Sequence, residues 1–162
     1  MPLEVRGTVE AQALLAAQIE RMRRPGPALR ASAEALDALI DGSIAAGQSP
    51  GGARWRRRKA AAAPATRDQR RRVVSRRDVP YPLLQRTGAL RSSVVVSSDE
   101  TSIRLSIPLY YAKFHQFGTS RMPARPIAPF SAKGRPLRRG PAGDWIATFR
   151  LNLARYVLRG SL

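Results

Sequence analysis

Two short runs in which apolar and polar residues alternate constrain the fold of this chain more than any other feature. One face is expected to carry Val94, Val96, Ile103, Leu105 and Ile107, and in the first run Ser93, Val95 and Ser97 are expected on the other face. The residues between the runs, 98–101, are polar and partly acidic, which suits a turn. The sequence therefore predicts an antiparallel β-hairpin over about residues 92–107 with one apolar face. A hairpin is only marginally stable by itself, so other elements must cover that face.

Apolar residues at helical spacing predict three helices that can supply this cover. We expect them over residues 10–24, 28–46 and 144–158, the last with Asp144 as its N-cap. The apolar stripe of the first helix is Leu15, Ile19 and Met22. The stripe of the second helix is Leu29, Ala33, Leu36, Ile40 and Ile44. The second helix is expected to be the main cover of the sheet, with the third packed beside it.

These elements predict an α+β fold, in which two or three helices pack a small antiparallel sheet and long extended loops connect them. The length suits one domain over residues 1–162. Its expected parts are an N-terminal helical segment 1–47, a basic arm 54–80, a core 81–130, a basic loop 131–143 and the C-terminal helix 144–158.

A short aromatic helix is expected after the second strand, which Pro108 ends because proline has no N–H for the ladder. Tyr110, Phe114 and Phe117 are spaced at i, i+4 and i+7, so they share one helical face. Gly118 is placed to end this helix in a left-handed conformation.

Several short motifs occur around these elements in a definite order. They are SPGGARW at 49–55, TG-x-LR-x-S at 87–93, Y-Y-A-x-x-H-Q-F-G at 110–118 and P-A-R-P at 123–126. The residues that we expect to build the structural motif are Trp55, Thr87, Gly88, His115, Gln116, Phe117, Gly118 and Pro126.

In this order the motifs resemble the virion morphogenesis (tail completion) proteins of Mu-like tailed phages and prophages, over about residues 47–130. The resemblance implies a small α+β subunit at the head-proximal end of the tail, of tail-terminator or neck type, without catalytic residues. It also implies a homo-oligomer, most simply a hexameric ring, in contact with tail-tube and neck or connector proteins. The expected location is the virion, after synthesis in the cytoplasm of the bacterial host.

The net charge of +18 is distributed unevenly, with −1 in residues 1–48, +11 in 49–91 and +8 in 92–162. Such a charge implies a partner of opposite sign, either DNA in the lumen of a ring or an acidic protein surface. The arginines expected at subunit or partner contacts are Arg70, Arg71, Arg72, Arg76, Arg77, Arg121 and Arg125. A basic nucleic-acid-binding protein, in a connector or packaging role, is the alternative function.

The sequence offers no recognisable catalytic or metal-binding group. The only histidine, His115, has aromatic neighbours, and the chain has no cysteine to pair with it. The acidic residues do not cluster as metal ligands or as an acid–base pair. No apolar run reaches the ~20 residues that span a bilayer. We therefore expect a protein that is not an enzyme, binds no cofactor and contacts no membrane.

Overall fold

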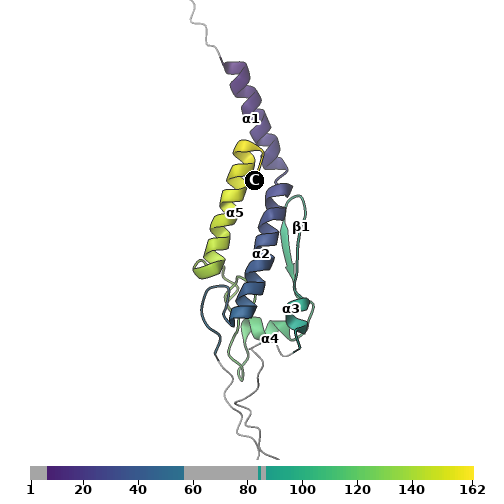
Figure 1. Ribbon diagram of the computed structural model, residues 1–162, viewed down its shortest axis with the longest axis vertical. Coiled ribbons are helices and arrows are strands. Elements are labelled where there is room, and N and C mark those ends of the chain that lie inside the picture. The colour runs from purple at the N-terminus through teal and green to yellow at the C-terminus, as the bar shows by residue number, and fades with distance from the viewer. Residues whose placement is uncertain (1–6, 57–83, 85–86) are drawn as a thin grey trace, which may run out of the picture.

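The computed structural model describes residues 7–56, 84 and 87–162 (Figure 1). Its elements are, in order, α1 (Thr8–Arg23), α2 (Gly26–Ala46), α3 (Ala89–Ser92), β1 (Val95–Ser98), β2 (Ile103–Ser106), α4 (Ala112–Phe117) and α5 (Gly140–Arg159). The two strands form an antiparallel hairpin, and long loops connect several of the helices. The predicted α+β fold class is confirmed.

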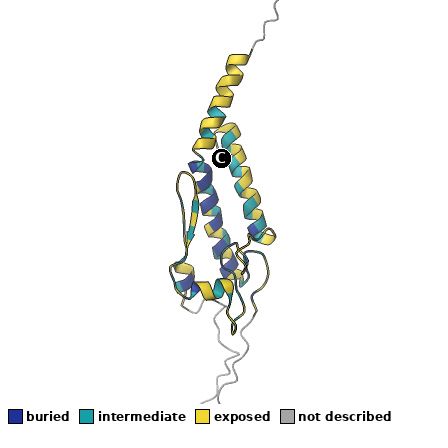
Figure 2. Ribbon diagram, turned by 180° about the vertical axis from the view of Figure 1, so that it is seen from behind, coloured by how far each residue is buried: buried dark blue, intermediate teal, exposed yellow. Residues whose placement is uncertain are grey.

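Helix α2 lies at the centre, with the hairpin on one side and α5 on the other (Figure 1). Every residue of its predicted stripe, from Leu29 to Ile44, is buried. Figure 2 shows this buried face along the length of α2. Gly47 follows the helix with φ 65° and ψ 35°, the left-handed conformation that glycine adopts without strain. The predicted role of α2 as the main core helix is confirmed.

The hairpin presents the predicted face to α2. Val95 pairs with Ser106 and Ser98 pairs with Ile103, so each strand contributes four residues to a ladder shorter than the predicted 92–107. The side chain of Val96 packs against the core, whereas Val95 points outward and is 53% exposed. The alternation in the sequence therefore assigned each strand residue to its correct face.

The turn of the hairpin is organised by Asp99. One carboxylate oxygen accepts hydrogen bonds from the backbone N–H of Thr101 at 2.8 Å and of Ser102 at 2.6 Å, and the other accepts from the Ser102 hydroxyl. These donors, the Thr101 amide first, lower the pKa of Asp99 from 3.8 to about 2. Glu100 lies beside Gly26, where a carboxylate is favoured by the dipole at the N-terminus of α2.

We expect this turn to loosen in acid, because the folded pKa of Asp99 is lower than its unfolded value. The ionised carboxylate of Asp99 stabilises the folded turn. This stabilisation is complete above the unfolded pKa of 3.8 and is lost as the pH falls through about 2. An NMR titration should therefore move the amide resonances of Thr101 and Ser102 together, with a midpoint near pH 2. An Asp99→Asn variant should show no such transition, and a wild-type midpoint near pH 4 would contradict the assignment.

Helix α5 begins at Gly140, four residues before the expected N-cap Asp144, so that boundary and the expected end of the basic loop at 143 were wrong. The reason is a long-range contact: the backbone N–H of Ala142 donates to the carbonyl of Pro50 at 2.7 Å. Pro141 also favours the first turn of a helix. The Trp145 indole N–H donates to the carbonyl of Ser32 at 2.8 Å, which fixes α5 beside α2 as predicted.

Helix α1 projects beyond the rest of the protein and contributes no buried residue within the described part of the chain (Figures 1 and 2). Its predicted stripe forms, but Leu15, Ile19 and Met22 are 58%, 46% and 56% exposed. Only its C-terminal end is held, where the Arg21 guanidinium donates to the carbonyl of Val157 on α5 at 2.8 Å. None of the described helices is both long and apolar enough to cross a bilayer.

Candidate interaction surfaces

Gln116 joins α4 to the loop that follows it. Its side-chain oxygen accepts hydrogen bonds from the backbone N–H of Ile127 at 2.8 Å and of Ala128 at 3.0 Å. Its side-chain nitrogen donates to the carbonyl of Phe130 at 2.8 Å. One polar side chain therefore fixes three backbone groups, and the side chain of Ile127 enters the core with 1% exposed. Sequence reasoning placed Gln116 in the motif but did not find this role.

The chain reverses at Gly118, which has φ 76° and ψ 179°. The sign of φ agrees with the prediction, but ψ lies far from the left-handed helical value, in a region that only glycine occupies readily. A Cβ atom on this residue would lie 2.8 Å from the backbone nitrogen of Ala124. The loop returns so closely that the N–H of Arg125 donates to the carbonyl of His115 at 2.6 Å.

Arg125 lies inside the subunit, which corrects the expectation that it faces a neighbour. The residue is 4% exposed, and its guanidinium donates through two nitrogens to the carbonyl of Arg56, at 3.1 and 3.3 Å. Pro126, partly buried, separates it from the core residue Ile127. The guanidinium points toward Arg56, the residue after Trp55, and not toward a neighbouring subunit.

The motif residues upstream are also structural. Trp55 is buried in the core, as predicted, with 6% exposed. Gly88 is left-handed and precedes α3, whose Leu90 is buried, while the Thr87 hydroxyl accepts only a long 3.4 Å bond from Ala89 N–H.

The arginine of the TG-x-LR motif, Arg91, has a role that was not predicted. It forms a two-point ion pair with Asp41 of α2, at 3.0 and 2.7 Å. This hydrogen bonding lowers the pKa of the Asp41 carboxyl below its usual value.

His115 is half-buried, and its ring lies edge-on to Tyr111 with the centroids 6.0 Å apart. No group of three or more histidine, cysteine or acidic residues that could hold a metal ion occurs in the described ranges. The surroundings of His115 therefore suit a packing role.

Four exposed aromatic side chains occur on α4 and its flanking loops. We define the aromatic patch as Tyr110, Phe114, Phe117 and Phe130, which are 77%, 39%, 55% and 43% exposed. Tyr110 contacts Phe114 edge-on at 6.5 Å, and the Lys113 ammonium lies over the Phe114 ring at 5.3 Å. The sequence predicted the shared face of the first three residues. Their exposure shows that these side chains do not enter the core.

The segment that carries the aromatic patch is basic. No Asp or Glu occurs from residue 101 to residue 143. The exposed cations in this range are Arg104, Lys113, Arg121, Lys133, Arg135, Arg138 and Arg139. Of the other predicted contact arginines, Arg121 is exposed, whereas Arg70, Arg71, Arg72, Arg76 and Arg77 lie outside the described residues.

Comparison with protein-family models matches residues 8–140 to the "Phage virion morphogenesis family". The chain belongs to the phage virion morphogenesis family. The match begins at the first residue of α1 and ends at the first residue of α5, so it includes all the motifs described above. No curated protein and no solved structure matches the chain.

Membership of the phage virion morphogenesis family supports a role in the structure and assembly of a phage virion, and hence association with the virion. It favours a structural protein over a catalyst. The expected family is confirmed. Within the described residues, the aromatic patch and α1 both carry large apolar side chains that are exposed.

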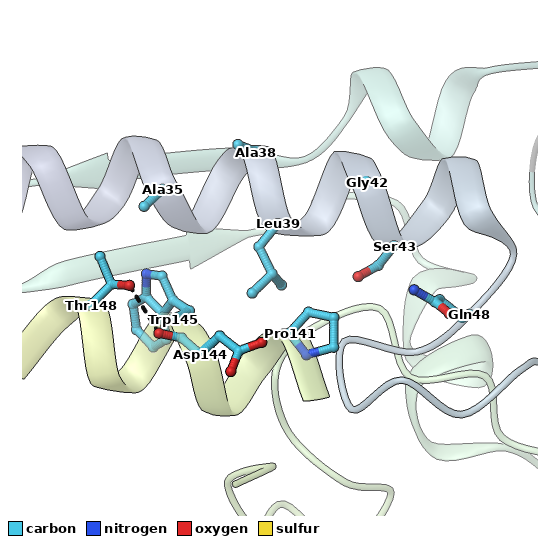
Figure 3. A pocket seen from close by; sticks show the side chains of 10 residues that line it. All are labelled: Ala35, Ala38, Leu39, Gly42, Ser43, Gln48, Pro141, Asp144, Trp145 and Thr148. Atoms are coloured by element: carbon cyan, nitrogen blue, oxygen red, sulfur yellow. Dashed lines mark hydrogen bonds between the residues drawn. The ribbon is translucent and has the colours of Figure 1, made fainter. Parts of the chain in front are cut away.

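A groove of about 540 Å³ lies between α2 and α5 (Figure 3). On the α2 side it is lined by small residues, including Ala35, Ala38 and Gly42, and on the α5 side by Trp145. Asp144, expected as an N-cap, lines the groove as part of α5. Sequence reasoning missed this groove. The small residues of α2 form only one of its walls, and the groove exists only because α5 packs opposite them.

Proposed function

We propose that this chain is a structural virion protein that completes or terminates the tail of a tailed phage or prophage-derived particle. In this proposal it forms a homo-oligomeric ring, with a hexamer as the simplest form, and joins the tail tube to the neck or connector. Family membership supports the virion role, and the exposed helix α1 is the observation that carries the ring.

The argument for self-association begins with the apolar surface of α1. Its large apolar residues, Val9, Leu14, Leu15, Ile19 and Met22, are all at least 46% exposed. Leu15, Ile19 and Met22, spaced at i, i+4 and i+7, share one face, and an exposed apolar face of this kind marks an interaction site. A helix of 16 residues is also only marginally stable in water unless one face is packed. A neighbouring copy would supply that packing.

We propose that α1 contacts the body of the next copy and not the α1 of a partner, which is the arrangement that gives a ring instead of a closed pair. Helix α1 projects from one end, so a contact between α1 and the body of the next copy joins two different surfaces. Contacts between different surfaces repeat from subunit to subunit and generate a ring when the rotation closes. The near-neutral α1 segment also reduces repulsion at a contact between two strongly basic subunits.

Genetic complementation would test this function directly. In a phage or prophage that lacks the gene, we expect wild-type protein to restore joined particles and to be detected in them as a ring by electron microscopy. A Leu15→Ser, Ile19→Ser variant should fold but reduce the yield of joined particles by about tenfold or more, as expected for the loss of central apolar contacts. Leu162→Ser, an exposed change at the C-terminus, is the control. Wild-type particles that contain only single subunits would contradict the ring.

The alternative of a nucleic-acid-binding protein is favoured by the absence of carboxylates between residues 101 and 143. Binding to duplex DNA through phosphates would weaken steeply with salt, with a slope set by the number of phosphates contacted. A steep slope together with normal particle assembly by the α1 variant would favour this alternative. The order of the motifs and the family match favour the tail protein.

A further inference from the structure

We propose that the aromatic patch and its basic surroundings form a docking surface for an acidic protein. The surface of that partner would carry an apolar pocket bordered by carboxylates. The inference rests on the proposed function in one respect: it expects that protein to be another component of the virion. The surface is independent of α1, because α4 and α1 lie at opposite ends of the molecule (Figure 1).

The charge of this surface selects an acidic partner. Lys113 and Arg121 are exposed on α4 and in the loop that follows it, and the segment 101–143 that carries them contains no Asp or Glu. Complementary charge steers association and suppresses unsuitable partners, but it contributes less affinity than buried anchors do. The anchors must therefore come from the apolar part of the patch.

The aromatic residues supply these anchors. Tyr110 and Phe117 are 77% and 55% exposed, so most of their ring surface can be buried by a partner. Aromatic residues and arginine are enriched at the energetic centre of protein interfaces. Tyr110 and Phe114 meet edge-on, and contiguous exposed apolar side chains mark interaction sites.

At Phe114, the geometry favours contact with protein over stacking of a base. Bases of single-stranded nucleic acid stack on flat, accessible ring faces. Here the Lys113 ammonium covers one face of Phe114, and Tyr110 meets the same ring edge-on. Duplex DNA offers no unstacked base and is bound through its phosphates, for which aromatic side chains are not needed.

The backbone beneath the patch is held in place before any partner arrives. Gln116 fixes Phe130 through its carbonyl, and the N–H of Arg125 is bonded to His115. An ordered surface loses less conformational entropy when it binds, which raises affinity. The patch therefore has the chemistry and the order of a docking surface.

Fluorescence anisotropy with four probes would test the proposal on the full chain: a random glutamate–tyrosine copolymer, poly-glutamate, a 20-nucleotide oligothymidine and a 20-base-pair duplex. We expect the wild-type protein to bind the copolymer more tightly than poly-glutamate. A Tyr110→Ser, Phe117→Ser variant should bind the copolymer about tenfold more weakly, with unchanged affinity for the duplex. The matched control is Val95→Ser, Leu162→Ser, which removes apolar residues that are 53% and 54% exposed elsewhere.

Three outcomes would overturn the proposal: equal wild-type affinity for the copolymer and poly-glutamate, an equal loss in the control, or an equal loss for oligothymidine, which would indicate a nucleic-acid surface. Circular dichroism melts of each variant would confirm that it is folded. Failure of the proposed function is distinguished separately, because wild-type protein would then be absent from purified particles whatever the copolymer result.

Discussion

Replacement of Gly118 with valine is expected to lower the free energy of unfolding by about 4 kcal/mol, through a strained backbone and a steric clash. The backbone has φ 76° and ψ 179°, which β-branched residues avoid. The new Cβ would also lie 2.8 Å from the nitrogen and 3.2 Å from the Cα of Ala124. These are backbone atoms, so the returning loop must move to make room.

The same substitution at Gly134 is the matched control. Gly134 also has a positive φ, 71°, but nothing lies within 4 Å of its Cβ position. Gly134→Val therefore carries the cost of a positive φ without the clash, and we expect it to cost about 1–2 kcal/mol. Chemical denaturation of both variants measures the difference. Equal losses would show that the loop at Ala124 moves freely and that Gly118 is required only for its φ.

The parts of the fold that were predicted correctly are those that neighbouring residues in the sequence determine. The stripe from Leu29 to Ile44 and the alternation around Val96 report which face each residue presents. The start of α5 was predicted incorrectly, because it depends on a hydrogen bond from Ala142 to Pro50, far away in the sequence. A good N-cap residue such as Asp144 is only a local preference, and this tertiary contact overrides it.

The candidate surfaces also depend on tertiary contacts that the local sequence does not reveal. The periodicity of Tyr110, Phe114 and Phe117 predicted one helical face, but periodicity cannot say whether that face meets the core or solvent. Arg125 shows the opposite error, since a charged side chain is normally exposed and this one is buried against the Arg56 carbonyl. Both depend on how much core volume α2 and the hairpin leave, which is a property of the whole fold.

Removal of the Gln116 side chain is expected to loosen the loop beneath the aromatic patch while leaving every ring of the patch in the sequence. Gln116→Ala removes the acceptor for the N–H groups of Ile127 and Ala128 and the donor to the Phe130 carbonyl. Two of these bonds are partly buried, and a buried group left without a partner costs about 1–3 kcal/mol. We therefore expect a loss of about 3 kcal/mol in the free energy of unfolding.

Hydrogen exchange would locate this loss. In Gln116→Ala, the amides of Ile127 and Ala128 should exchange faster than in the wild type, while those at the centre of α2, such as Ile40, change only with global stability. Gln116→Glu is the informative comparison, because a carboxylate still accepts from both amides but places its second oxygen against the Phe130 carbonyl, with no proton to donate. It should protect Ile127 and Ala128 yet release Phe130. Unchanged exchange at Ile127 and Ala128 in Gln116→Ala would mean that the buried Ile127 side chain alone fixes this loop, and that the aromatic patch owes its order to packing instead of to Gln116.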